Sequence, residues 1–277
     1  MPGLVEMRVR QSRPGRLSDP FHDFDDQGLR EILSTRDDVL MWQHLQALFG
    51  PHLPAGTYAE VVYFLPWAFQ FLFDRQDGFG EITNAVTGWI AKNTESLASD
   101  GLLESARANL LACLEQWAGG FDVLQRSVAP RRHCTWGLYY VKNSEIVTEF
   151  LAQLVQHGRQ ADVATEFLRS ISFRSCNKFQ LAWFLELSRS LPSEFATSPF
   201  FRDLTLPPEI ATLLGDRESR RRAALVVMKE FVPLPEQAAL GRDVRRAQYR
   251  LGDVAACQAA ALTQIPANMA SRPDAIY

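Results

Sequence analysis

The sequence lacks the short motifs by which metal sites and hydrolytic sites are usually recognised. It contains no HExxH, ExxH, HxE or CxxC pattern. Its histidines are scattered without ligand spacing: His22, His44, His52, His133 and His157. The four cysteines are also far apart, and no signal-peptide-like apolar stretch precedes them. We therefore expect no metal and no cofactor, and we interpret the cysteines as reduced thiols of a cytoplasmic protein.

Hydrophobic runs are also too short for a membrane span, which needs roughly 20 apolar residues. The most apolar stretch, residues 61–73, contains Gln70 as its only polar residue and ends at Asp74. Thr57 and Glu60 directly before it have the spacing of a capping box. These features predict a buried helix. The side chains expected to be almost fully buried are Phe64, Leu65, Trp67 and Phe71.

Apolar residues recur at helical spacing along most of the chain, between short breaks that contain proline or glycine. Pro66 predicts a kink or a junction of two short helices, because proline cannot donate to the carbonyl of Val62. Asp100 and Ser175 are predicted helix N-caps. Besides residues 57–73, helices are predicted at 26–34, 36–49, 79–97, 100–118, 143–157, 160–171, 177–190, 207–214, 218–231, 235–249 and 252–263. The sequence therefore predicts an all-α protein, either an irregular helical bundle or a solenoid-like stack of antiparallel helix pairs.

Charge is distributed unevenly along the chain and suggests two lobes. Residues 1–18 carry four Arg and one Glu, whereas residues 19–130 carry sixteen acidic and six basic side chains. We predict a basic N-terminal segment, 1–18, that is mobile unless docked, followed by an acidic helical lobe, 19–130. A second helical lobe with basic C-terminal helices, 131–264, and a tail, 265–277, complete the organisation. The expected boundary between the lobes lies within residues 126–141.

Carboxylates cluster at the start of the acidic lobe and resemble three kinds of site. His22 and Asp23 resemble the doublet of helical HD phosphohydrolases, but the required upstream histidine is absent. A calcium loop starting at Asp23 would need Glu at its twelfth position, which is a serine. A DDxxD magnesium motif starting at Asp37 lacks its last acid. We therefore interpret these carboxylates as helix-capping groups, some of which face solvent and meet a basic partner. The candidate partner-binding residues are Asp19, Asp23, Asp25, Asp26, Asp37 and Asp38.

Two further patterns lack the residues that would complete a catalytic or phosphate site. Ser175 and Lys178 match the S-x-x-K of penicillin-interacting serine enzymes, but no K-T-G or S-D-N triplet accompanies them. Gly78 and Gly80 lack the third glycine of a phosphate-binding loop. We expect no catalytic residue at either place.

Arginines near the C-terminus are the one place where a nucleic-acid interpretation applies. Acidic residues lie among them and aromatic residues are sparse, so a solvated face, or a face paired with the acidic lobe of the same molecule, is the simpler interpretation. The cluster contains Arg217, Arg220, Arg221, Arg222, Arg242, Arg245, Arg246 and Arg250.

Residues 57–73, TYAEVVYFLPWAFQFLF, are followed by two predicted helices that end LLACLEQW at Trp117. This region, 57–117, resembles the Tyr-Phe-Leu-Pro helix of uncharacterised bacterial proteins, some encoded near polymorphic toxins and thought to act as immunity proteins. The resemblance implies a non-enzymatic protein that occludes a toxin or effector domain with a basic surface, and it implies no catalytic residue.

A nucleic-acid-associated regulator using residues 217–250 is the alternative, and a helical enzyme with a dispersed site is a third hypothesis. The charge distribution separates the first two. A toxin binder should expose the acids of residues 19–38, whereas a nucleic-acid binder should keep its arginines exposed and contiguous.

Overall fold

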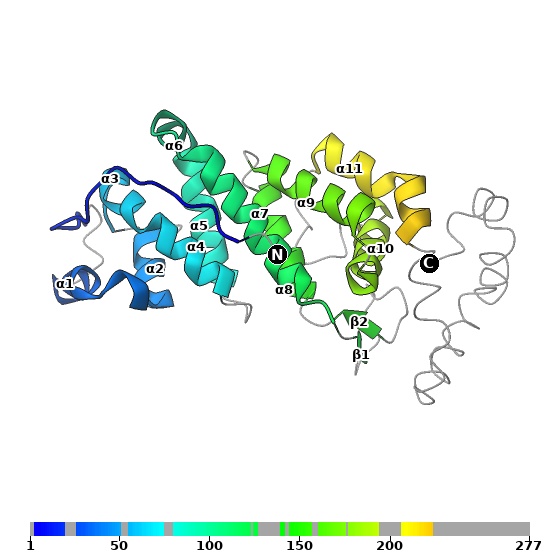
Figure 1. Cartoon of the computed structure of the whole chain (residues 1–277), viewed down its shortest axis with the longest axis horizontal. Coiled ribbons are helices and arrows are strands. Elements are labelled where there is room, and N and C mark those ends of the chain that lie inside the picture. Colours follow the sequence, from blue (N-terminus) through cyan, green and yellow to red (C-terminus); the bar gives the residue numbers. More distant parts are fainter. Residues whose placement is uncertain are drawn as a thin grey trace, which may run out of the picture. The chain divides into compact units, whose positions relative to one another are not determined.

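The computed structural model describes residues 3–19, 26–50, 55–74, 80–122, 124–126, 139–141, 144–156, 160–175, 177–193 and 206–223 (Figure 1). These ranges are mainly helical, which confirms the predicted all-α class. The α-helices with printed bounds are α1 (Asp26–Ser34), α2 (Trp42–Phe49), α3 (Tyr58–Val61), α4 (Leu65–Asp74), α5 (Gly80–Lys92), α6 (Thr94–Ser99), α7 (Leu103–Gly119), α8 (Ser144–Gln156), α9 (Ala161–Arg174), α10 (Lys178–Ser193) and α11 (Pro208–Gly215). Residues 217–223 are also helical.

Shorter elements connect these helices. Two 3-10 turns, η1 (Asp37–Val39) and η2 (Val62–Phe64), precede α2 and α4. Strands β1 (Leu124–Arg126) and β2 (Tyr139–Val141) form an antiparallel pair with Gln125 opposite Tyr140. Within the described ranges, no helix is long and apolar enough to cross a membrane.

The apolar stretch folds as two short helices, as Pro66 predicted. Glu60 accepts a hydrogen bond from the backbone N–H of Thr57 at 2.7 Å, which confirms the predicted capping box at the start of α3. The carbonyl of Val62 accepts the N–H of Leu65 and so closes the 3-10 turn η2. Because Pro66 has no N–H to offer this carbonyl, the chain tightens for one turn before α4 begins.

Two predicted helices are interrupted. Residues 36–49 form η1 and α2, because the chain is extended at Leu40 and Met41, and the backbone N–H of Met41 donates to Nδ1 of His44 at 3.1 Å. Residues 79–97 divide into α5 and α6 at Asn93. The predicted helices 235–249 and 252–263, and the part of 218–231 beyond residue 223, lie outside the described residues.

The chain divides into two compact units, of which the first comprises residues 1–118 and 146–164. Its core includes α2 packed against α5, with the rings of Phe49 and Trp89 meeting edge to face at 5.3 Å. Helix α7 lies against α4, where the indole N–H of Trp117 donates to the carbonyl of Leu72 at 2.8 Å. Cys113 is buried beside them, where it packs as a small apolar group, and burial raises the pKa of its thiol.

The second unit comprises residues 119–145 and 165–277. In its described part, α10 packs against α11 and β2. The ring of Trp183 contacts Phe121 and Phe167, with centroids 5.8 and 6.0 Å away. The predicted lobe boundary between residues 130 and 131 lies outside the described residues.

The apolar helix is not covered on every side. Phe64 and Leu65 are fully buried as predicted, but Trp67 and Phe71 are only partly buried. The prediction for these two is wrong because they share a helix face with the exposed Gln70, while Phe69 and Leu72 point into the core.

Both predicted N-caps are also wrong. Asp100 is the C-cap of α6, and Asn177 caps α10 by accepting the N–H of Phe179 at 2.9 Å, while Ser175 lies two residues earlier.

Candidate functional site

The N-terminal segment, residues 3–19 as the structure describes them, contains no helix or strand and lies along the first unit (Figure 1). We expected it to be mobile unless docked, and it is docked. Its contacts with the helices of the first unit are spread over its length, from Val5 to Ser18. They bring together residues that are far apart in the sequence and form a polar site of this unit.

Near the start of the segment, Val5 is bound through its backbone. The N–H of Val5 donates to Oδ1 of Asn109 at 2.6 Å, and Nδ2 of Asn109 donates back to the carbonyl of Val5 at 3.0 Å. Asn109 is buried on α7, whereas 45 % of Val5 is exposed. The amide therefore recognises an extended backbone and is indifferent to the side chain that the backbone carries.

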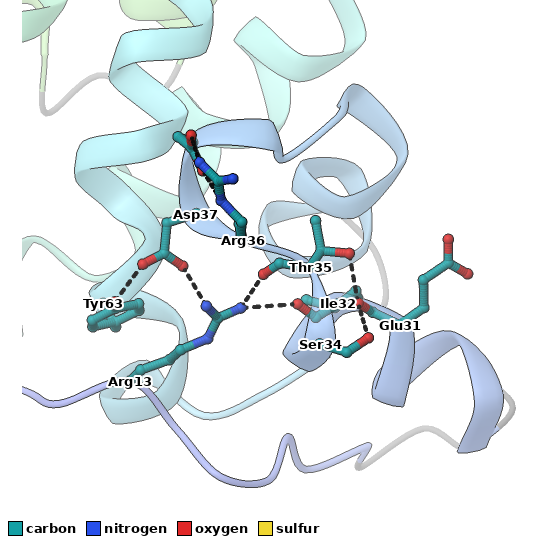
Figure 2. Close-up of polar contacts among 9 residues, drawn as sticks. Arg13, Glu31, Ile32, Ser34, Thr35, Arg36, Asp37 and Tyr63 are labelled. Carbon is teal, nitrogen blue, oxygen red and sulfur yellow. Dashed lines mark hydrogen bonds and ion pairs between the residues drawn. The ribbon is translucent and has the colours of Figure 1, made fainter.

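Arg13 anchors the middle of the segment in the cluster that Figure 2 shows. Its Nη1 lies 3.0 Å from Oδ1 of Asp37, and the hydroxyl of Tyr63 donates to the other carboxylate oxygen at 2.6 Å. The hydrogen bond to Asp37, together with burial, raises the pKa of Tyr63 against the lowering effect of Arg13, so the hydroxyl stays a donor. This carboxylate is thus held by two groups and is not available to a partner while Arg13 is in place.

The same guanidinium also closes the C-terminal end of α1. Its Nη2 donates to the carbonyls of Ile32 and Thr35, and its Cζ lies 6.0 Å from the ring centroid of Phe64. The last carbonyls of a helix carry partial negative charge and favour a cation. The position therefore suits a planar group with several donors, which is arginine rather than lysine.

The end of the segment is tied to the start of α3. The carboxylate of Glu60 accepts from the backbone N–H of Ser18 at 3.1 Å and from its hydroxyl at 3.0 Å, in addition to capping Thr57. Burial acts to raise the pKa of Glu60, but the hydrogen bonds from Thr57 and Ser18 together lower it. Glu60 is therefore a carboxylate whose charged form is stabilised by both the helix and the docked segment.

Gly56 allows the close approach at this point. Its N–H donates to the carbonyl of Ser18 at 2.6 Å, and its φ of 94° is in the region that favours glycine. A Cβ at this position would lie 2.8 Å from a methyl of Val61 and 3.3 Å from a methyl of Leu17. Leu17 is itself 4 % exposed, so it is the apolar anchor of the segment.

Asp100 provides a further acceptor. One of its oxygens accepts from the side-chain amide of Gln11 at 3.0 Å and from the hydroxyl of Tyr58 at 2.9 Å. The ring of Tyr58 stacks on Trp89 with centroids 5.6 Å apart. Burial and the hydrogen bond to Asp100 raise the pKa of Tyr58, which keeps its hydroxyl protonated at physiological pH.

The structure distributes the predicted partner-binding acids over different roles. Asp37 holds Arg13, and Asp38 pairs with Arg36 on the surface. Asp19 is partly buried at the end of the segment, and Asp26 begins α1. The remaining two, Asp23 and Asp25, lie outside the described residues.

The predicted arginine cluster is partly used within the second unit. Arg222 donates to the carbonyls of Ser172 and of Ser175, the latter at 2.7 Å, and so caps the C-terminal end of α9. Arg221 pairs with Glu218 at 3.1 Å, and Arg217 is exposed. Arg220 lies on the same helix and is partly buried. The structure does not describe Arg242, Arg245, Arg246 and Arg250.

Sequence reasoning did not identify Asn109 as part of a site. A signal was present, because this amide lies between Ala106 and Cys113 on the apolar face of α7, where a buried polar group needs a partner. Asp100 and Glu60 were noticed only as caps. Nothing in their spacing indicated that a segment so distant in the sequence would donate to them.

Among the residues that the structure describes, no group of three or more His, Cys, Asp or Glu side chains could hold a metal ion. The arrangement binds an extended segment through one carboxylate that pairs with an arginine, two carboxylates that accept from neutral donors, and one amide. No protein-family model matches the chain, and searches among curated proteins and solved structures found no match.

Proposed function

We propose that this protein is a non-enzymatic binding module of the bacterial immunity type, which occludes a toxin or effector domain with a basic surface. One observation carries the proposal. In the first unit, Asp37 pairs with Arg13 of an arginine-rich extended segment, while Glu60 and Asp100 accept hydrogen bonds from the neutral donors Ser18 and Gln11 of the same segment. The Asp37–Arg13 pair is the kind of contact by which an acidic surface recognises a basic partner. The resemblance of residues 57–117 to proteins encoded beside toxins supports the same conclusion.

Exposed carboxylates near the docked segment supply the negative charge that attracts a basic partner during association. Side-chain exposure is 68 % at Glu31 and 51 % at Asp38, although Asp38 also contacts Arg36. Exposed charges of this kind mainly set the association rate and its dependence on salt. Asp37 is excluded from this role because it holds Arg13, so its substitution would disturb the docked segment itself.

The test begins with purification from the source cells at low ionic strength and identification of the protein that co-purifies. Association rates are then measured for the wild type and for Glu31→Lys/Asp38→Lys. We expect several-fold slower association for the variant at low salt. The difference should shrink above about 0.15 M salt, where the screening length is about 8 Å. Glu81→Lys/Glu104→Lys, which reverses two exposed acids of α5 and α7, is the matched control.

Unchanged association rates in the Glu31→Lys/Asp38→Lys variant would contradict the proposal. Salt-sensitive binding of duplex DNA, lost on replacement of Arg217 and Arg221 by Ala, would favour the nucleic-acid alternative instead. If the partner is toxic when expressed alone, co-expression with this chain should restore growth.

A further inference from the structure

The contacts of the N-terminal segment amount to a recognition pattern that another chain can share. Backbone groups of Val5 and Ser18 make some of them, and specific side chains make the others. Val5 is read through its backbone, while Glu6 and Arg8 point to solvent with side-chain exposures of 77 and 86 %. The side chains that make specific contacts are Gln11, Arg13, Leu17 and Ser18.

Asn109 requires a backbone N–H and a backbone carbonyl at the position of Val5. Both polar atoms of its amide are satisfied by Val5, as in one rung of a β-ladder. Any residue except proline can supply the same donor and acceptor. Because Asn109 lies in the otherwise apolar face of α7, an extended backbone at this place satisfies a group that would need water if the segment left.

The site that binds Arg13 is the one that selects for a particular side chain. Carbonyls of Ile32 and Thr35 and the carboxylate of Asp37 surround the guanidinium of Arg13, and Tyr63 holds the carboxylate in place. Lysine has a single ammonium nitrogen, so it cannot donate to these separate acceptors at once, as the planar guanidinium of arginine does. The surface therefore fits an extended segment that presents an arginine eight positions after the backbone read by Asn109, followed by an apolar residue four positions later.

The segment is attached by separate contacts and has no secondary structure of its own. It lies outside the helices, and it is held at several points by hydrogen bonds, one ion pair and the buried side chain of Leu17. Each contact of this kind contributes little to stability by itself. A covalently tethered segment nevertheless competes at an effective concentration of about 1 mM, so it shields the surface from a dilute competitor.

We propose that residues 3–19 occupy, within the chain, the site at which an extended arginine-bearing segment of the partner binds. The partner must then displace the segment, which acts as a built-in competitor. This inference deepens the proposed function and depends on it for the partner, but the site itself can be tested without one.

The test uses the full chain and a fluorescent synthetic peptide with the sequence of residues 3–19. The released variant Val5→Pro/Arg13→Ala removes the N–H bound by Asn109 and the cation bound by Asp37. Its matched control, Val5→Ala/Arg8→Ala, changes side chains that are exposed. We expect the peptide to bind the released variant at least tenfold more tightly than it binds the wild type or the control, measured by fluorescence anisotropy.

Two substitutions define the recognition. Adding Asn109→Ala to the released variant should weaken peptide binding at least tenfold, and so should an Arg13→Lys change in the peptide. Equal peptide affinity for all proteins would overturn the inference. A released variant that binds no peptide while its circular dichroism stays helical, or one that no longer folds, would also overturn it by showing that the segment is only structural.

The outcomes separate this inference from the proposed function. Peptide binding to the released variant with no basic protein partner in any assay would leave the site in place and contradict the proposed function. Tight partner binding that is the same in the wild type and the released variant would contradict the inference alone.

Discussion

Charged side chains in the two units support different kinds of structure. In the first unit, Asp37 binds Arg13 of a segment that has no helix or strand. In the second unit, Arg222 lies on a helix and caps the end of α9 at Ser172 and Ser175. Both arginines donate to the last carbonyls of a helix, α1 for Arg13 and α9 for Arg222, but only Arg13 belongs to a segment that lies outside the helices. We therefore expect Arg222 to contribute to the stability of its unit, and Arg13 mainly to control access to a surface.

The comparison requires that the helical core beneath the segment has its own stability. Phe64 is fully buried and lies under Arg13, so Phe64→Ala should lower the free energy of unfolding by about 3–5 kcal/mol. Trp67→Ala, next on the same stretch, is the control and should cost less than half as much because Trp67 is only partly buried. Urea denaturation measures both. Equal losses would mean that Phe64 and Trp67 are buried to a similar extent, which would contradict the structure.

Arg222→Ala tests the other side of the comparison. The substitution leaves the carbonyls of Ser172 and Ser175 without their charged donor, and Ser172 is fully buried. We expect a loss of about 2–3 kcal/mol, typical of hydrogen bonds to a charged group. Arg221→Ala on the same helix removes only a surface pair with Glu218 and should cost less than about 0.5 kcal/mol. Similar effects of the two substitutions would remove the distinction between capping and surface arginines.

Two neighbouring aspartates allow a direct comparison of a docking contact with a surface ion pair. The pair Arg13–Asp37 has side-chain exposures of 30 and 17 %, whereas Arg36–Asp38 has 78 and 51 %. Double-mutant cycles to alanine should give a coupling energy of about 1–2 kcal/mol for the first pair and less than about 0.5 kcal/mol for the second. If the couplings are equal, Arg13 does not hold the segment as we infer.

Helix positions were predictable because their signals are local. Apolar spacing located α1, α8 and α10 to within a few residues, and the missing N–H of Pro66 predicted the junction before α4. Interruptions at Met41 and Asn93 were not predicted, because a helical apolar pattern can continue across a turn that a single local hydrogen bond decides.

The candidate site was less predictable than the helices because it depends on tertiary contacts. The sequence showed an acidic region and a basic segment, but it did not show that Asp37 faces Arg13 or that Asn109 faces Val5. Burial was similarly uncertain within the apolar stretch, where Trp67 and Phe69 are equally apolar in the sequence and only one points inward. Such pairings require the positions of several helices, which periodicity does not supply.

The smallest expected effect concerns Glu60 and its dependence on pH. Hydrogen bonds from Thr57 and Ser18 lower its pKa in the folded protein, so the unfolded chain binds more protons near its ordinary value of about 4.3. The stabilisation by Glu60 is therefore fully present at neutral pH and is lost as the pH falls below about 5. Glu60→Gln should cost about 1 kcal/mol at pH 7 and progressively less toward pH 3, measured by urea denaturation at each pH, whereas Glu81→Gln on the surface of α5 should change little. A difference between wild type and Glu60→Gln that stays constant from pH 7 to pH 3 would mean that this carboxylate does not join the segment to α3 through its charge.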